Sequence, residues 1–554
     1  MKSNKDYDVI VIGSGIGGSS IASIIAKNGF SVLSLEKGKH PRLSWGEATL
    51  PQSSFWMKFI SERYDFPELK VLSDSCLISK EVSKTCGIKT SIGFAYHEEG
   101  KTHDMKTMSN QFLAPEIPFL SETHFFREDV DMYMANASKK YGVDLMENTE
   151  VIAVDIDSGG VKVRIKDGTE FKSKYIIDSS GKGSVIAKKY DLHDKPTRLK
   201  TESRCIWSHF ENIKVFDEMF SKSDLPGFKH RFHDGTLHHV FDGGWFWIIP
   251  FNNHKDSTNQ TVSVGLMLDC RKYPRDNSID PETEFFSFVN KFPTVAKHLG
   301  NAKSTKGFMA TDRIQYSCKN TVGERYFITP QAYGAVDALY SRGLISTFES
   351  MFVSTKIILD ALKSNDFSIG RFEGLNELHR DQLDMHDRMV SIAYKSYNNY
   401  ESHAAWIKVW VASKFYGDVW LFRSLMKYMS SNDKIILDKL DFHNPPFKKH
   451  LKELVDIADS AFTKAEEGLV SWEEATSLLT TALKDATWLP HGQIPLDKTD
   501  EYHFDFTPEL KLPAIIFWGK TRAPEWVRKN MFDFFPTPLI KAKIKEQIGM
   551  DVHS

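Results

Sequence analysis

The chain of 554 residues is 41% hydrophobic and 26% charged, a balance typical of a globular protein rather than a disordered or fibrous one. Its length predicts two or three closely packed units. A formal net charge of −2 gives no basic excess for nucleic acid or an anionic membrane surface, so neither is expected as a partner. The N-terminus lacks a signal-peptide pattern and no apolar run is long enough to span a membrane. Five scattered cysteines without a C-x-x-C pair indicate reduced thiols, so we predict a cytoplasmic protein without a bound metal.

A dinucleotide-binding pattern opens the chain at residues 5–40. Residues 8–12 (DVIVI) predict a buried parallel strand, residues 19–28 a helix, and residues 31–35 a second strand that ends in an acid. The glycines after the first strand are spaced G-x-G-x-x-G, which permits a tight turn, close approach of the backbone to a pyrophosphate, and close packing of the helix. The helix N-terminus would face the pyrophosphate, and the acid would accept hydrogen bonds from a ribose. The residues expected to bind the dinucleotide are Gly13, Ser14, Gly15, Ile16, Gly17, Gly18 and Glu36.

Later segments have to distinguish FAD from NAD, because both cofactors use this pattern and glycine turns also occur for packing alone. Three segments favour FAD. Arg127 precedes an amphipathic helical pattern in residues 125–137, and residues 174–183 form a strand that runs into Asp178 and a glycine turn. Between them, two alternating segments that begin at Val151 and Val161 predict a hairpin.

This layout resembles the FAD monooxygenase superfamily, which includes p-hydroxybenzoate hydroxylase, over roughly residues 5–360. The resemblance implies that Arg127 contacts the flavin cofactor and that Val151 lies in the cofactor site. It also implies an α/β fold, with a Rossmann-like FAD-binding domain, an inserted β-sheet substrate domain and a helical C-terminal region. We predict a core at residues 1–375, with its β-rich substrate part at about residues 190–310, and a mainly helical domain at residues 376–554.

Residues 245–250 (WFWIIP) match the pattern W-x-W-x-I-P of the flavin-dependent halogenases, a narrower resemblance within the superfamily. Alternate residues of a strand point the same way, so Trp245 and Trp247 would share one face. The resemblance implies that this aromatic pair is a barrier between the flavin and the organic substrate. The alternative is an aromatic strand that only fills a core.

A second halogenase-like feature is Lys89 in residues 87–94 (GIKTSIGF), which resemble the lysine-bearing strand of that family. The lysine would donate a hydrogen bond to hypohalous acid, or carry the halogen as a haloamine once burial lowers its pKa. The alternative is a solvent-facing lysine, with Lys84 as the rival candidate.

Residues 330–347 (PQAYGAVDALYSRGLIST) resemble the segment that passes the flavin ring and opens a helix, and residues 42–51 resemble the family's G-E-S loop. The resemblance implies halide binding at Arg342 and Gly343, flavin contact at Leu344, and a catalytic role for Ser341 beside that of Lys89.

Two departures from the family pattern matter. Pro330 and Gln331 replace the G-D pair that usually meets the ribityl chain, so we expect weaker FAD binding or support from Asp337. Tyr340 replaces the glutamate that assists tryptophan halogenases in activating indole. Its absence favours an electron-rich phenolic acceptor, which needs only deprotonation by a histidine or tyrosine.

From about residue 375 onward the pattern is helical, and Trp406 and Trp410 share a helix face. We expect these helices to cover the flavin domain, and a substrate pocket between them and the Trp245 strand is a hypothesis. Residues 485–536 are rich in proline and aromatic residues without a clear period and are expected to wrap the surface.

The resemblance implies an FAD-dependent halogenase of secondary metabolism. A separate flavin reductase supplies FADH2, oxygen forms a flavin hydroperoxide, and chloride or bromide gives hypohalous acid for an aromatic substrate that is free or tethered to a carrier protein. One alternative is an FAD-dependent aromatic hydroxylase, which would lack halide dependence. Another is an FAD-binding scaffold or sensor, which would consume no oxygen.

Overall fold

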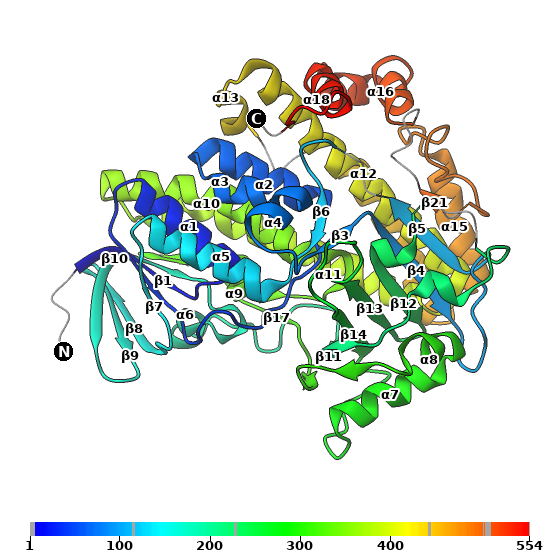
Figure 1. The fold of residues 1–554 in the computed structure, drawn as a ribbon, viewed down its shortest axis with the longest axis horizontal. Coiled ribbons are helices and arrows are strands. Elements are labelled where there is room, and N and C mark those ends of the chain that lie inside the picture. Colours follow the sequence, from blue (N-terminus) through cyan, green and yellow to red (C-terminus); the bar gives the residue numbers. More distant parts are fainter. Residues whose placement is uncertain are drawn as a thin grey trace.

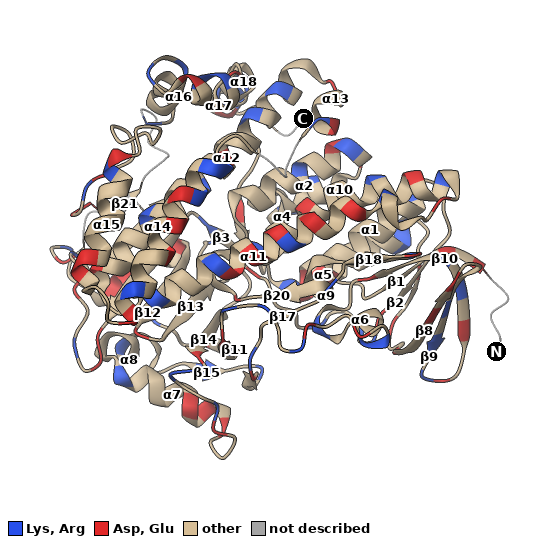
Figure 2. Ribbon diagram, turned by 180° about the vertical axis from the view of Figure 1, so that it is seen from behind, with Lys and Arg blue, Asp and Glu red and all other residues tan. Residues whose placement is uncertain are grey.

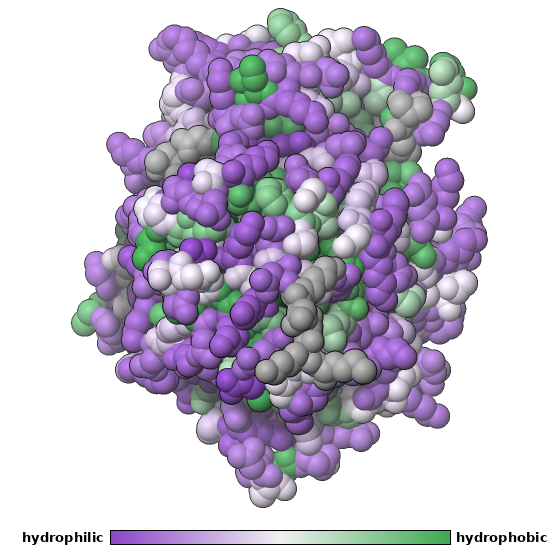
Figure 3. Space-filling view, turned by 90° about the vertical axis from the view of Figure 1, so that its left-hand side faces the viewer, coloured by the Kyte–Doolittle hydropathy of each residue, from purple (hydrophilic) through white to green (hydrophobic). Residues whose placement is uncertain are grey.

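The computed structural model describes residues 6–113, 117–225, 230–440, 445–501, 503–504 and 511–552. Figure 1 shows an N-terminal α/β layer beside a second large sheet, with long helices from the C-terminal third packed across both. Figure 3 shows hydrophilic residues over most of the face at the N-terminal end, with hydrophobic residues in small groups.

The first sheet confirms the predicted dinucleotide-binding unit. Within the described residues it has eight strands, in the order β18-β19-β10-β1-β2-β7, and the hairpin β8–β9 joins it at β10. The five neighbours from β19 to β7 are parallel, and β1 and β2 are buried on both faces as their continuous apolar runs predict. The strands are β1 (Asp6–Ile12), β2 (Val32–Leu35), β7 (Asp144–Met146), β8 (Val151–Asp157), β9 (Gly160–Ile165), β10 (Glu170–Asp178), β18 (Val322–Gly323) and β19 (Tyr326–Ile328).

Helices α1 and α5 pack on this sheet, and α10 packs against α1 (Figure 1). The helix after the glycine turn begins at Ile16, three residues before the predicted start, and Gly29 follows its end with φ of +89°. The helices of residues 1–364 are α1 (Ile16–Lys27), α2 (Pro51–Tyr64), α3 (Pro67–Leu72), α4 (Ser75–Glu81), α5 (Arg127–Lys140), α6 (Val185–Lys189), α7 (Pro281–Lys291), α8 (Pro293–Leu299), α9 (Pro330–Tyr333) and α10 (Arg342–Ser364).

The second sheet has nine described strands, in the order β15-β11-β14-β13-β12-β4-β5-β21, with β16 beside β11. It extends beyond the predicted β-rich segment, because β4 pairs in parallel with β12 and brings β5 with it. The strands are β4 (Ser91–His97), β5 (Ser109–Leu113), β11 (Ser203–Glu211), β12 (Thr236–Phe241), β13 (Gly244–Pro250), β14 (Val262–Asp269), β15 (Lys303–Ser304), β16 (Met309–Ala310) and β21 (His503–Phe504). Two further pairs are β3 (Gly87–Lys89) with β6 (Glu122–His124), and β17 (Tyr316–Ser317) with β20 (Gly334–Ala335).

The two faces of the second sheet belong to different hydrophobic clusters. Trp245 and Trp247 of β13 join the large cluster that includes the C-terminal helices. Phe246 and Ile248 point the other way, into a smaller cluster with residues of α7 and α8. The predicted shared face of the two tryptophans is therefore confirmed.

The C-terminal third is helical, and its longest helix, α12 (Tyr400–Ser431), packs against α2, α11, α14, α15 and α18. Figure 2 shows both signs of charge interspersed on these helices, whose apolar faces turn inward. Helix α11 begins close to residue 375, but the division into domains stays a prediction. No described helix is both long and apolar enough to cross a membrane. The other helices are α11 (Glu373–Ser396), α13 (Ile435–Asp438), α14 (Lys448–Glu466), α15 (Trp472–Asp485), α16 (Lys511–Thr521), α17 (Glu525–Met531) and α18 (Thr537–Gln547).

Candidate active site

The glycine turn has the geometry that a bound pyrophosphate requires. Gly13 has φ of +91°, and a Cβ there would lie 2.6 Å from the carbonyl oxygen of Ser179. A Cβ on Gly18 would lie 2.0 Å from the carbonyl oxygen of Gly13, so only glycine lets α1 pack this closely on β1. The nearest atom to a Cβ on Gly15 would be a side-chain nitrogen of Arg42, 3.5 Å away, so backbone does not cover the outer side of this turn. The turn therefore fits the diphosphate of a dinucleotide.

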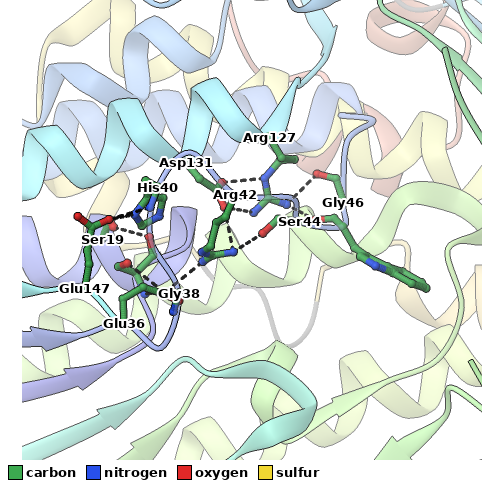
Figure 4. A network of polar contacts seen from close by, with 12 residues as sticks. Ser19, Glu36, Gly38, His40, Arg42, Ser44, Gly46, Arg127, Asp131 and Glu147 are labelled. Carbon is green, nitrogen blue, oxygen red and sulfur yellow. Dashed lines mark hydrogen bonds and ion pairs between the residues drawn. The ribbon is translucent and has the colours of Figure 1, made fainter. Parts of the chain in front are cut away.

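Two arginines lie over this turn and share a buried carboxylate (Figure 4). Arg127 donates to Asp131 from Nε at 2.8 Å and from Nη2 at 3.1 Å, and also to the carbonyl oxygens of Trp45 and Gly46. Arg42 lies 3.7 Å from the same carboxylate and 3.3 Å from Glu36. The arginines are thus fixed as positive charges beside the N-terminus of α1, which favours a bound anion.

Glu36 lies at the end of β2, where the ribose-binding acid is predicted. It accepts hydrogen bonds from the backbone N–H groups of Ser14 and Gly38, both at 2.9 Å. Burial raises the pKa of Glu36, but Arg42 and these N–H groups outweigh it and hold the pKa below its usual value. The carboxylate is therefore ionised and acts as an acceptor. Val151 begins β8 two residues after Thr149, whose N–H group bonds to the carbonyl oxygen of Glu36.

The start of α10 meets the glycine turn and the segment at residues 42–51. A Cβ on Gly17 would lie 2.9 Å from Cγ2 of Thr347, and one on Gly46 would lie 3.9 Å from Leu344. Gln331, which stands where the superfamily has an acid, donates a hydrogen bond to the carbonyl oxygen of Gly343 at 3.2 Å. The fold thus brings together the glycine turn, the segment at residues 42–51 and the segment at residues 330–347, which are distant in the sequence.

Tyr340 and Ser341 both adopt left-handed backbone conformations, with φ of 67° and 50°, just before Arg342 begins α10. The Ser341 side chain makes no capping hydrogen bond, so it leaves the first N–H groups of α10 available to an anion. The hydroxyl of Tyr340 accepts a hydrogen bond from Trp406 at 2.9 Å, and its ring stacks on Trp410 at 5.0 Å. Burial raises the pKa of Tyr340 far above its usual value, so this tyrosine is not a suitable base.

The carboxylate of Asp337 is hydrogen-bonded to protein groups on both oxygens. Both of its oxygens accept hydrogen bonds, one from Ser203 at 2.5 Å and Tyr394 at 3.1 Å, the other from the Leu339 N–H group at 3.0 Å. Burial raises the pKa of Asp337 to about 6. Tyr394 also accepts a hydrogen bond from Trp245 at 3.2 Å, which connects the tryptophan face of β13 to the Asp337 segment.

Trp245 and Trp247 lie with ring centroids 6.0 Å apart and are 1% and 6% exposed. The ring of Trp247 covers Gly265, where a Cβ would approach it to 2.1 Å. The pair is a rigid aromatic wall, and its role as a barrier beside the flavin stays a prediction.

Lys89 is buried, with 3% of its surface exposed, whereas the rival Lys84 is exposed. Its Nζ lies 3.2 Å from Oε2 of Glu122 and also donates to the carbonyl oxygen of Thr49. Burial lowers the pKa of Lys89 and raises that of Glu122, against the opposing attraction within the pair. Such a lysine loses its proton more readily than one in water, as a group that accepts halogen must.

A cavity of about 260 Å³ lies between α2, α11, α12, α14 and the start of α10. It is lined by aromatic rings and by charged and polar groups, among them Trp410, Tyr340, Trp56, Arg342, Lys414 and Gln52. No residue of β13 lines it, so it differs from the hypothesis of a pocket against the Trp245 strand. A mixed aromatic and polar cavity of this size suits a small aromatic molecule.

The sequence analysis does not identify Glu122, Lys414 or Asp418 as site residues. It also does not show that Tyr340 is unsuited to act as a base. Lys414 and Asp418 are four residues apart and form an ion pair at 2.7 Å on α12, a spacing that the sequence does display. Nothing in the sequence places Glu122 opposite Lys89, because their contact comes from the pairing of β3 with β6.

Comparisons with known proteins agree with this geometry. Residues 11–58 match the family described as NAD(P)-binding Rossmann-like domain. The chain is 35% identical to the monodechloroaminopyrrolnitrin halogenase PrnC of Pseudomonas fluorescens, over 98% of this chain and 97% of that one. The chain belongs to the flavin-dependent halogenases. The tetracycline 7-halogenase of Kitasatospora aureofaciens is 33% identical over 93% of both chains.

A crystal structure of the halogenase PltM in complex with phloroglucinol and FAD has the same architecture, with a TM-score of 0.84 and 29% identity over 91% of this chain and all of that one. The predicted enzyme class, the Rossmann-like α/β fold and the FAD, oxygen and halide requirement of this halogenase family are therefore confirmed. The alternative of a non-catalytic FAD-binding scaffold or sensor is not supported, because these relatives are halogenases.

Proposed function

We propose that this halogenase transfers chlorine or bromine to a phenolic acceptor in secondary metabolism and that Lys89 delivers the halogen. The observation that carries the proposal is the buried Lys89–Glu122 pair, since a lysine without solvent contact and with a lowered pKa suits transfer of an electrophilic halogen. Tyr340, in the place of an indole-activating glutamate, supports an acceptor that is already electron-rich. The crystallised PltM complex contains a phenol, phloroglucinol, which supports the same class.

In this proposal the glycine turn, Glu36, Arg42, Arg127 and Val151 hold FAD. Leu344 supports its ring end, and Asp337 supports that end indirectly, by holding the segment that leads into α10. Reduced FAD, with oxygen and halide, supplies the oxidised halogen when bound. The first N–H groups of α10 at Arg342 and Gly343 hold the halide, with Ser341 beside them. The wall of Trp245 and Trp247 keeps the acceptor apart from the flavin, and Lys89 positions the halogen.

A separate flavin reductase is proposed as the source of FADH2, as members of this family generally need one. The acceptor is a small molecule, free or tethered to a carrier protein. A cytoplasmic location rests on the five cysteines, all free among the described residues.

The test is an assay of the purified protein with FAD, a flavin reductase, NADH and a panel of phenols that includes phloroglucinol, in chloride or in bromide. We expect mass spectra with the isotope pattern of the halide supplied. Lys89→Ala should abolish halogenated product while FADH2 is still oxidised, and the matched Lys84→Ala, at an exposed lysine, should keep full activity. A hydroxylated product without halogen would instead favour the aromatic hydroxylase.

A further inference from the structure

A second lysine, Lys414, lies on the wall of the cavity. Trp406, Trp410 and Lys414 follow one another at intervals of four residues on α12 and therefore share a face. Trp410 and Lys414 both line the cavity, so a flat aromatic wall continues directly into an ammonium group. This combination fits an aromatic ring that carries a negative oxygen.

Lys414 has hydrogen-bonding capacity left for a ligand. It is 4% exposed, donates to Asp418 at 2.7 Å, and lies 4.8 Å from the ring centroid of Phe112. An ammonium group has three donors, and Asp418 is the one hydrogen-bond acceptor of Lys414 among the residues that the structure describes. A buried ammonium with free donors is costly, and an anionic ligand would satisfy it.

Lys414 also acts on the carboxylate that pairs with Lys89. Burial raises the pKa of Glu122, and the charges of both Lys89 and Lys414 oppose that rise. Leu50, which follows the Thr49 carbonyl that Lys89 contacts, lines the cavity as well. Leu50 therefore links the cavity wall to the Thr49 carbonyl oxygen that Lys89 contacts.

The other cations at the cavity are less suited to this task. Lys448 is 42% exposed in its side chain and pairs with Asp381 at 3.1 Å, and Lys452 pairs with Asp456 at 2.8 Å. Arg342 donates a hydrogen bond to Gln52 at 3.2 Å. It also interacts electrostatically with Glu349, and burial raises the pKa of Glu349 to about 7. Among these cations in the described residues, Lys414 alone combines burial and free donors with a charge that acts on Glu122.

We propose that Lys414 anchors the acceptor, its ammonium group binding the ionised oxygen of a phenol whose ring lies against Trp410. This inference rests on the proposed function, because it assigns the acceptor class and its binding residue. Binding the phenolate raises the electron density of the ring, which makes its ortho and para carbons better nucleophiles for electrophilic halogen. Asp418 keeps the ammonium in place as a positioning residue.

The first test measures binding without turnover. 4-Nitrophenol is titrated with pH in the presence of the protein, and the visible absorbance of its anion reports ionisation of the bound phenol. We expect the ionisation midpoint of bound 4-nitrophenol to fall by about one pH unit or more in the wild type and in Lys414→Arg, but not in Lys414→Met. The matched control is Lys427→Met, since Lys427 lies on the same helix and pairs with Asp533 at 2.5 Å.

The second test compares each phenol with its methyl ether in the halogenation assay. The ether cannot ionise, so Lys414→Met should raise KM for the phenol by roughly 10- to 100-fold and leave KM for the ether nearly unchanged. If Lys414→Met folds poorly, Lys414→Met/Asp418→Asn removes the stranded carboxylate and should show the same selectivity.

Equal losses for phenol and ether, or an unshifted midpoint in the wild type, would overturn the anchoring role. Loss of the midpoint shift in Arg342→Gln alone would also overturn it, in favour of Arg342. Failure of the proposed function looks different, since no phenol would then be halogenated even when 4-nitrophenol is bound as its anion.

Discussion

The buried pair of Lys89 and Glu122 predicts a strong energetic coupling between the two residues. Their charged atoms lie 3.2 Å apart and their surfaces are 3% and 4% exposed. At an effective dielectric constant of about 20, a separation of this size corresponds to an attraction of about 5 kcal/mol. Removal of one partner strands the other charge in the interior, so Glu122→Gln or Lys89→Met should each lower the free energy of unfolding by roughly 3–5 kcal/mol.

The double variant Lys89→Met/Glu122→Gln removes both charges and leaves Lys414 paired with Asp418. It should be destabilised by less than the sum of the two single changes, with a coupling of at least about 2 kcal/mol. Chemical unfolding followed by tryptophan fluorescence measures all four proteins. Additive losses, with a coupling below about 0.5 kcal/mol, would show that Lys89 and Glu122 do not form a buried pair.

Three further predictions concern the cofactor site and stability. Gly18→Ala places a Cβ 2.0 Å from the Gly13 carbonyl oxygen, and should abolish FAD retention during gel filtration; normal retention would contradict the close packing of α1. Arg42→Gln should weaken FAD binding roughly 10- to 100-fold by flavin fluorescence titration, whereas Arg164→Gln on the exposed hairpin should not, and equal affinities would argue against the arginine pair. Burial lowers the pKa of His379 to about 3, so its ring stays neutral in the folded state. In the unfolded state the ring takes up a proton below a pH of about 6.5. The free energy of unfolding therefore decreases as the pH is lowered from about 6.5 towards 3. At pH 5, His379→Gln should therefore reduce proton uptake on unfolding by about one proton, measured by potentiometry, and an unchanged uptake would contradict the neutral buried ring.

The sequence predicts features that depend on neighbouring residues. The glycine turn, the acid at the end of β2 and the alternation of Trp245 and Trp247 follow from strand and turn geometry within a few residues, and the fold confirms all three. The buried state of Lys89 is suggested by its strand but decided only by the partner strand that brings Glu122.

The sequence does not show which segments pair with each other when they are far apart in the chain. The parallel pairing of β4 with β12 joins segments about 140 residues apart, and extends the second sheet beyond the predicted segment. The cavity combines α2 with helices of the C-terminal third, so its position away from β13 depends on how those helices pack. Helices α16 and α17 form in a region rich in proline and aromatic residues where no helix is predicted, because packing overrides weak local preference.

Delivery of halogen by Lys89 is tested most directly by looking for oxidised halogen on that residue. The protein is turned over with FADH2, oxygen and bromide but without a phenol, passed rapidly through a desalting column, and mixed with a chromogenic thiol. We expect about one oxidising equivalent per chain to stay with the protein, to be lost in Lys89→Met and to be retained in Lys84→Met. An oxidising equivalent that stays with the Lys89→Met protein, or none in the wild type while phenols are still halogenated, would contradict delivery of halogen by Lys89.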